Sequence, residues 1–257
     1  DEALKINPKY FDSLFFKAIT QLKIGDYENG WKNYEYRWET TNFPSPKRKF
    51  IQPCWNGTDS LNDKIILLHG EQGLGDNIQF VRYFNLVKSK AKKVILQVNK
   101  KLVRLFKESN LSENILSNNE KLPEFDVHCP LLSLPFKFST TLKNIPFNDK
   151  YLFPNKDRII KWQKRFNNQF LNIGINWQAS PNPDLDKGNS FKLKYFQDIS
   201  LIEKTKLYSL QKFNGLDQIN ENKKKLKLNI IDNFDEDVPF VDTAAIIENL
   251  DLIITCD

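Results

Sequence analysis

The segment His69-Gly70-Glu71-Gln72-Gly73-Leu74-Gly75-Asp76 combines three glycines with side chains that can do chemistry. Its glycines let the backbone approach a ligand closely, and a helix that begins after them offers unpaired N–H groups. The carboxylate of Asp76 can accept the proton of a hydroxyl group that attacks a sugar carbon, a general-base step worth about 10²–10⁴-fold in rate. We therefore predict that Asp76 is catalytic and that Gln72, Gly73 and Gly75 bind substrate. The alternative is a glycine-rich turn in which Asp76 only caps the helix.

This loop does not match two common phosphate-binding patterns. Gly73-Leu74-Gly75 is followed by Asp76-Asn77-Ile78, without the third glycine of a dinucleotide fingerprint, and no Gly-Lys-Ser/Thr ending completes a P-loop. A nicotinamide-dependent oxidoreductase also needs an acidic residue after the second strand, where this chain has Asn99, Lys100 and Lys101. The sequence argues against that enzyme class.

Polar side chains follow two predicted strands in the second half of the chain. Trp177 can stack on a base or a sugar, and Gln178 and Ser180 can supply hydrogen bonds. A tryptophan that only packs in the core remains an open alternative. In the next such segment, Ser209-Leu210-Gln211-Lys212, we expect Gln211 and Lys212 to contact the donor. The Lys212 ammonium can neutralise a diphosphate leaving group, or can be one of the many surface lysines.

The elements that carry these residues fall into three parts. Residues 11–24 and 26–38 show the apolar spacing of two packed helices, with a turn at Gly25 and a cap at Asp26. This pair resembles a divergent tetratricopeptide repeat (TPR) over residues 1–40, with Arg37 where the repeat has a small residue, and it needs further repeats or the next domain to bury its face. Residues 41–63 are rich in turn-forming residues and read as a linker.

The rest of the chain alternates strands and helices. We predict strands at 64–68, 94–98 and 125–128 with helices from about residue 76 and at 100–107, and then strands at 171–177, 207–210, 230–232 and 252–255 with helices at 157–166 and 241–249. Such alternation is typical of parallel βαβ units and an α/β fold. We expect two domains, 64–150 and 151–257, that face each other across a ligand cleft at the strand ends.

Composition narrows the classes of partner. The net charge of +6 comes from lysines that are spread along the chain among acidic residues, so we expect a solvated surface and no nucleic-acid partner. Apolar runs are strand-sized and no signal-peptide pattern begins the chain, so we expect a cytoplasmic protein with at most peripheral contact to the inner membrane face. Three widely spaced cysteines indicate neither a disulfide framework nor a metal site.

Five runs in order give the chain a family resemblance, at residues 69–83, 126–135 (with Ser133-Leu134-Pro135), 174–180, 209–212 and 242–257. Together they resemble the bacterial TPR glycosyltransferases, relatives of the lipopolysaccharide heptosyltransferases. The resemblance implies a GT-B fold, made of two Rossmann-type domains. It also implies inverting transfer of a sugar from a nucleotide-sugar donor to a glycan, lipid or protein acceptor, with no cofactor and no catalytic metal.

Some site residues rest on this resemblance. Gly75-Asp76 is similar to the Gly-Asp pair that holds the family's proposed base, and Asp257 is similar to the Asp that opens the donor loop, which implies an incomplete donor domain. Where the family carries Arg-Ser, this chain has Asn189-Ser190, so Ser190 stays a donor contact while Lys187 or Lys212 must replace the arginine charge. A non-catalytic binding or scaffold protein, which meets a protein partner through its helical segment, is the alternative.

Overall fold

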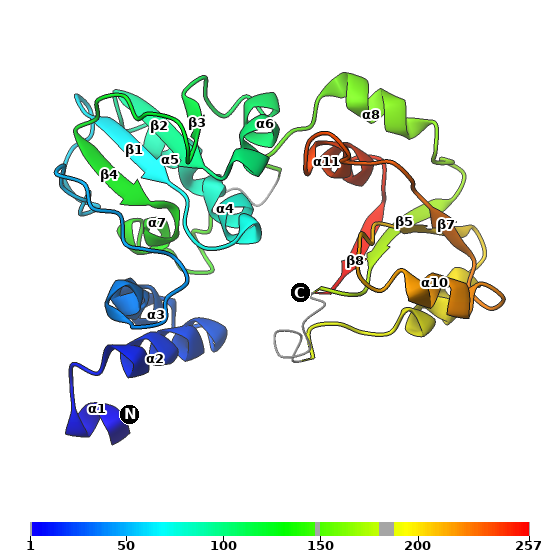
Figure 1. Cartoon of the computed structure of the whole chain (residues 1–257), viewed down its shortest axis with the longest axis horizontal. Helices are drawn as coiled ribbons and strands as arrows, with labels where there is room; N and C mark the ends of the chain where they lie inside the picture. Colours follow the sequence, from blue (N-terminus) through cyan, green and yellow to red (C-terminus); the bar gives the residue numbers. More distant parts are fainter. Residues whose placement is uncertain (1, 147–149, 180–187, 257) are drawn as a thin grey trace. The chain divides into compact units, whose positions relative to one another are not determined.

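Two parallel β-sheets organise the chain in the computed structural model (Figure 1), which describes residues 2–146, 150–179 and 188–256. Each sheet belongs to its own compact unit, Asp1–Leu152 and Phe153–Asp257. The expected mixed α/β class is therefore confirmed. The first unit includes the helical segment and residues 41–63 in addition to the first sheet.

The helical segment consists of α1 (Glu2–Ile6), α2 (Phe11–Lys23), α3 (Tyr27–Tyr34) and the 3₁₀ helix η1 (Glu35–Glu39). Gly25 forms the turn between α2 and α3 with φ of +87°, and the Asp26 side chain caps α3 by accepting from the Asn29 N–H. The two helices pack so closely that a Cβ added at Gly30 would lie 2.7 Å from Leu22 Cδ2. The second helix is shorter than predicted, since the chain tightens to a 3₁₀ turn at Glu35.

The first sheet contains β1 (Ile65–His69), β2 (Lys93–Val98), β3 (Ile115–Ser117) and β4 (Val127–Pro130), all parallel, in the order β3-β2-β1-β4. Its helices are α4 (Leu74–Phe80), η2 (Val81–Tyr83), α5 (Phe84–Lys88), α6 (Lys100–Glu108), η3 (Leu131–Ser133) and α7 (Leu134–Lys137). The sequence prediction lacked β3, which is too short to show a pattern. It also began α4 two residues late, at Asp76 instead of Leu74.

The second sheet repeats this order as β7-β6-β5-β8, again all parallel. Its strands are β5 (Leu171–Asn176), β6 (Thr205–Ser209), β7 (Leu228–Ile230) and β8 (Leu252–Thr255). Its helices are α8 (Lys156–Gln163), η4 (Leu193–Phe196), α9 (Gln197–Ser200), α10 (Asp217–Asn222) and α11 (Val241–Ile247). In chain order, both sheets therefore run third, second, first, fourth strand, which is the order of the first four strands in a dinucleotide-binding doubly wound sheet.

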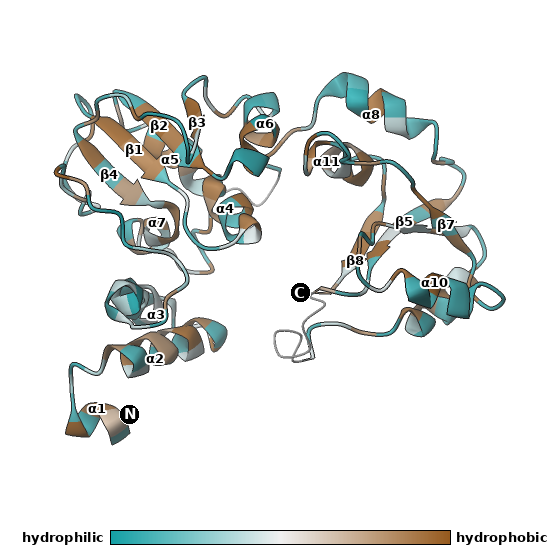
Figure 2. Ribbon diagram, viewed as in Figure 1, coloured by the Kyte–Doolittle hydropathy of each residue, from teal (hydrophilic) through white to brown (hydrophobic). Residues whose placement is uncertain are grey.

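The strands β1 and β2 form the apolar centre of the first unit, and Figure 2 shows the first sheet largely brown, whereas α8 and α10 carry many teal residues. Ile66, Leu67 and Leu68 of β1 have no exposed surface. Near-continuous burial is expected for parallel strands that are covered on both faces.

Residues 41–63 are not a free linker, because part of this segment follows the edge strand β4. Cys54 forms an isolated parallel bridge with His128, and the Trp55 N–H donates to the His128 carbonyl oxygen at 2.8 Å. Trp55 and Leu61 are buried. The segment is thus part of the first unit's structure and can place side chains at the end of its sheet.

Candidate functional site

The glycine-rich loop follows β1 and is held at several points. The Gly70 N–H donates to the Gln97 carbonyl oxygen of β2 at 2.8 Å. Gln72 adopts a left-handed backbone with φ of +56°, which is uncommon for a residue with a side chain. Its N–H donates to Ser45 Oγ and its Nε2 donates to Tyr34 Oη, both at 2.6 Å. Gln72 is therefore fixed by residues of the helical segment and of residues 41–63.

Each of the three glycines in the loop has a different surrounding. A Cβ at Gly70 would lie 2.0 Å from Asn77 Oδ1, because the buried Asn77 side chain crosses beneath the loop and donates to the Glu71 and Gly73 carbonyls. A Cβ at Gly73 would come 3.1 Å from Asp76 Oδ2, whereas one at Gly75 would meet nothing within 4 Å. Gly70 is thus required by packing within the protein, and the space beside Gly75 is open.

Asp76 lies in the first turn of α4 and is half-buried. Its Oδ2 accepts the Gly73 N–H at 2.8 Å, so part of the capping alternative is present in the structure. Within the described residues the side chain makes no other hydrogen bond, which leaves Oδ1 available. A carboxylate fixed through one oxygen can still accept a proton at the other.

Arg37 fills the space between the ends of β1 and β4. Its Nε and Nη2 donate to the two Glu71 oxygens at 2.9 and 2.8 Å, and Nη2 also donates to Ser133 Oγ at 2.8 Å. Burial favours a lower pKa for Arg37, but the hydrogen bonds and charges of Glu71 and Glu35 outweigh it and raise the pKa. Arg37 is therefore a buried cation that joins three segments of the first unit.

A cavity of about 300 Å³ opens beside this cluster at the carboxyl end of the first sheet. Residues that follow β1, β2 and β3 contribute to it, as do residues from the helical segment and from 41–63. Its lining comprises Trp38, Ser45, Pro46, Arg48, His69, Gly70, Glu71, Gln72, Asn77, Asn99 and Asn118. A second hollow of about 710 Å³ shares Trp38, Arg48 and His69 with it and extends toward His128.

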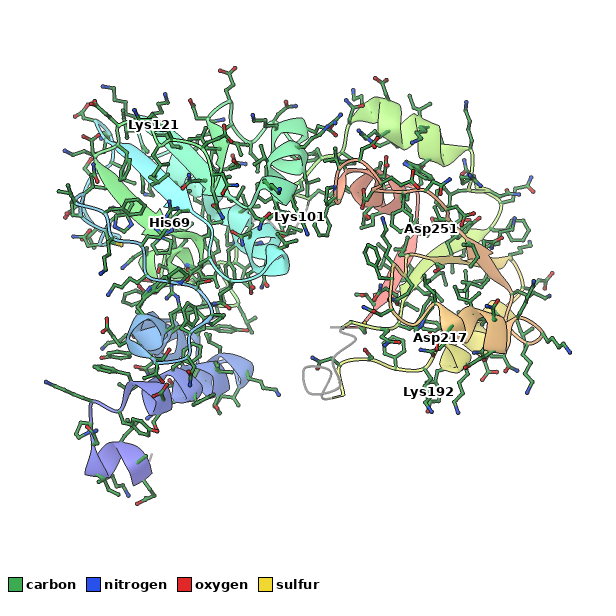
Figure 3. The ribbon with its side chains drawn as sticks, viewed as in Figure 1. His69, Lys101, Lys121, Lys192, Asp217 and Asp251 are labelled. Carbon is green, nitrogen blue, oxygen red and sulfur yellow. The ribbon has the colours of Figure 1, made fainter. Side chains whose placement is uncertain are left out.

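His69, which Figure 3 labels at the end of β1, lines both hollows, and His128 lines the larger one. His69 Nε2 is 3.2 Å from His128 Nδ1, and His69 Nδ1 is buried without a partner among the described residues. Burial, with the charges of Arg48, His128 and Arg37, lowers the pKa of His69 well below its usual value. Burial and Arg48 also lower the pKa of His128. Both rings are therefore neutral at neutral pH.

Several residues of this site were missed by reading the sequence. Asn99 and Asn118 directly follow β2 and β3. A polar residue directly after a predicted strand could have indicated Asn99, whereas β3, which precedes Asn118, was not predicted. Arg48 lies in a segment with no regular pattern, and Arg37 stood out in the sequence only as a departure from the expected repeat. No local signal pairs His69 with His128, which are 59 residues apart in the chain.

The second unit corrects one expectation directly. Trp177 has no exposed surface and packs in the core with Ile175, Leu193 and Leu207. Its Nε1 donates to the Gly215 carbonyl oxygen at 3.2 Å. Its ring is therefore not available to stack on a ligand, because both faces are used by the core.

Gln211 and Lys212 are also engaged within the second unit. Gln211 Oε1 accepts from the Trp177 and Gln178 N–H groups, both at 2.9 Å, and its Nε2 donates to the Gln178 carbonyl at 2.8 Å. Gln211 is thus a link between the ends of β5 and β6, which accounts for its burial. The Lys212 ammonium donates to the Phe234 carbonyl and lies 4.5 Å from the Phe234 ring centroid.

Two further predicted contacts lie nearby, at the end of β5. Gln178 is half-buried, and its Oε1 accepts from Gln218 Nε2 at 3.2 Å. Ser190 Oγ accepts the Ala179 N–H at 2.9 Å, which brings residue 190 beside the end of β5. Three predicted donor contacts, Gln178, Ser190 and Gln211, therefore lie together at the end of β5. The predicted site residues of the first unit, Gln72, Gly73, Gly75 and Asp76, lie together after β1. Ser180, Lys187 and Asp257 lie outside the described residues.

Comparison of the chain with protein-family models, curated proteins and solved structures finds no match. Within the part of the chain that the structure describes, no three His, Cys, Asp or Glu side chains are placed to hold a metal ion. No helix in those same ranges has both the length and the apolar character needed to cross a membrane.

Proposed function

We propose that this protein is a glycosyltransferase that moves a sugar from a nucleotide-sugar donor to a hydroxyl group of a glycan, lipid or protein acceptor. The observation that carries the proposal is the Asp76 carboxylate, which the Gly73 N–H holds through one oxygen in the first turn of α4. The preceding loop, at Gly70, Glu71 and Gln72, lines a cavity at the end of a parallel sheet together with Asn77 of α4. Ligands of open α/β sheets bind outside the carboxyl ends of the strands, which is where this cavity lies.

In the proposed reaction, Asp76 accepts the proton of the acceptor hydroxyl while that oxygen attacks the anomeric carbon. The bond between this carbon and the donor phosphate breaks, and a nucleoside diphosphate leaves. Attack from the face opposite the leaving group inverts the configuration. The hydrogen bond from Gly73 contributes by holding the carboxylate in one orientation, since a base must be within reach of the proton that it takes.

The repeated strand order supports a two-domain transferase of the GT-B type. Both units place a strand-loop-helix connection after their first strand, and both sheets have the same parallel order. In this proposal the first unit binds the acceptor and the second unit binds the donor, with Gln178 and Ser190 as donor contacts. The helical segment is proposed to be a TPR that contacts a protein partner. The proposed location is the cytoplasm, with at most peripheral contact at the membrane.

A second candidate is a non-catalytic binding or scaffold protein of the same ancestry. The observation in its favour is that Trp177, Gln211 and Lys212, three expected donor contacts, make their interactions inside the second unit. A protein that had lost the reaction would tolerate such a change.

Donor binding separates the two candidates. The 257-residue chain would be mixed with UDP-, GDP-, ADP- and CMP-linked sugars in the presence of EDTA, and its thermal unfolding would be followed. A donor present at about 100 times its Kd should stabilise the folded state by about 2.7 kcal/mol, which gives a clear rise in Tm. A flat response to all four donors at millimolar concentration would favour the scaffold.

A further inference from the structure

We infer that the cavity beside Arg48 binds the anionic group, a carboxylate or a phosphate, of a sugar-sized ligand. The site is built by the first unit alone. That this ligand is the acceptor of sugar transfer rests on the proposed function, whereas the binding of an anion does not.

The Arg48 guanidinium is held in place by neighbours that carry no charge. Its Nη2 donates to Gln97 Oε1 at 2.5 Å, and Gln97 Nε2 in turn donates to the Ser117 and Glu120 carbonyls. The guanidinium also lies 4.8 Å from the Phe50 ring centroid. Such contacts fix the planar group before a ligand arrives, which lowers the entropy lost on binding.

This cation has no anionic partner among the described residues, where no carboxylate oxygen lies within 4.0 Å of Arg48. The carboxylate that lines this cavity, Glu71, and the one that lines the adjoining hollow, Glu35, are both paired with Arg37. Glu71 accepts two hydrogen bonds from Arg37, and Glu35 accepts another at 2.7 Å. Arg48 is partly buried, and burial lowers its pKa. A partly desolvated positive charge without a counter-charge is unfavourable, and an anion in the cavity would relieve this cost.

Uncharged polar side chains around the cavity can form hydrogen bonds with the hydroxyl groups of a sugar. Asn99 uses its Oδ1 to cap α6, by accepting from the Lys101 N–H at 3.0 Å, so its side-chain NH₂ group is left to donate. The Asn118 side chain, which follows β3, joins the same lining. His69 is only 2% exposed and neutral, and its Nδ1, unpartnered among the described residues, can pair with a hydroxyl group. A volume of about 300 Å³ is at the lower end of small-molecule sites, which span about 300–1,000 Å³.

Calorimetric titration of the 257-residue chain with three sugars tests the inference. The ligands are glucuronic acid, which carries a carboxylate, glucose 6-phosphate, which carries a phosphate, and neutral glucose. We expect one or both anionic sugars to bind at least about tenfold more tightly than glucose, since hydrogen bonds between charged groups are about twice as strong as neutral ones. Preference for one anionic sugar identifies the anionic group that the site takes.

Three variants show whether Arg48 is responsible. Arg48→Gln should weaken binding of the preferred anion by about tenfold or more, whereas Arg48→Lys, which keeps the charge and loses the planar fork, should lie between it and the wild type. Arg104→Gln, an equal loss of charge on the exposed part of α6, should bind as the wild type does. If Arg48→Gln does not fold, Arg48→Lys carries the comparison.

Two results would overturn the inference: anionic sugars that bind no better than glucose, or equal losses in Arg48→Gln and Arg104→Gln. No donor is present in this assay and no transfer is measured. The anionic sugar can therefore bind even if the protein transfers no sugar, so that a failure of the proposed reaction is told apart from a failure of the anion site.

Discussion

Arg37 and Glu71 form a buried ion pair with two hydrogen bonds, in which Nε and Nη2 donate to the two carboxylate oxygens at 2.9 and 2.8 Å. Arg37 belongs to the helical segment and Glu71 to the glycine-rich loop. Glu71 Oε1 also accepts the Leu132 N–H at 3.2 Å, and Arg37 reaches Ser133. The pair therefore fixes the helical segment, the loop after β1 and the turn after β4 to one another.

Removing one member of this pair should strongly destabilise the first unit. Arg37→Met leaves the Glu71 carboxylate buried without a counter-charge, and breaking a buried pair in this way costs about 3–5 kcal/mol in the free energy of unfolding. Urea unfolding of the variant measures the loss. Replacing both partners, as Arg37→Met with Glu71→Leu, should recover much of it.

The control for this experiment is Arg104→Met, which breaks an exposed pair with Glu108 on α6. Exposed pairs contribute about 0–1 kcal/mol. A loss in Arg37→Met no greater than in this control would contradict the role given to the buried pair.

Stability should fall as the pH drops below the usual pKa of histidine, because His69 is buried in its neutral form. Its folded-state pKa is lowered well below 6.5, so between the two pKa values the unfolded chain binds a proton that the folded chain does not. The free energy of unfolding then decreases with falling pH, by up to about 1.4 kcal/mol per unit for one such group. His69→Gln should reduce this slope when unfolding is measured from about pH 7.5 to 5. An unchanged slope would show that His69 is not the group responsible.

Alanine substitutions in the glycine-rich loop separate packing from ligand contact. Gly70→Ala should destabilise by about 1–3 kcal/mol, because its Cβ would overlap Asn77 Oδ1 and force a shift. Gly75→Ala has open space and a helical position, so it should keep or raise stability by up to about 1 kcal/mol. If Gly75 contacts substrate as predicted, Gly75→Ala should still weaken substrate binding. Equal stability effects at the two positions would contradict the difference between their surroundings.

Trp177 should behave as a core residue. Trp177→Ala is expected to lower the free energy of unfolding by about 3–5 kcal/mol, as large-to-small changes in a core do. Phe213→Ala is a matched aromatic truncation at a side chain that is 83% exposed, and it should change stability by less than about 0.5 kcal/mol. If Trp177→Ala changed the free energy of unfolding only slightly but abolished donor binding, the prediction that Trp177 stacks on the donor would stand and its core role would be contradicted.

The parallel sheets were readable from the sequence because β1 and β2 contain the apolar runs 65–68 and 94–96, and β5 has apolar residues at alternate positions, Leu171, Ile173 and Ile175. The glycine-rich loop was readable too, since three glycines between a strand and a helix form a local pattern. Non-local features were not readable. The Arg37–Glu71 pair and the position of Arg48 beside Gln97 join residues that are 34 and 49 positions apart, and β3 gains its stability from pairing with β2 rather than from its own three residues.

Trp177 shows a second limit of sequence reading. A tryptophan after a strand has the same local sequence whether it faces a ligand or the core, and only packing with Leu193 and Leu207 decides. Gln211 is similar, because its buried amide satisfies the backbone of Trp177 and Gln178. The sequence shows that a tryptophan and a glutamine follow these strands, but it does not show which residues they contact.

Turnover of Asp76→Asn tests the central claim most directly. With a donor found by thermal shift, the transfer rate of the 257-residue chain would be measured in EDTA for the wild type, Asp76→Asn and the exposed control Asp63→Asn. The asparagine keeps an oxygen for the Gly73 N–H but cannot accept a proton, so turnover should fall by about 10²-fold or more while donor affinity and the Asp63→Asn rate stay near wild type. Wild-type turnover in Asp76→Asn would contradict the account and leave Asp76 as a residue that only holds the start of α4.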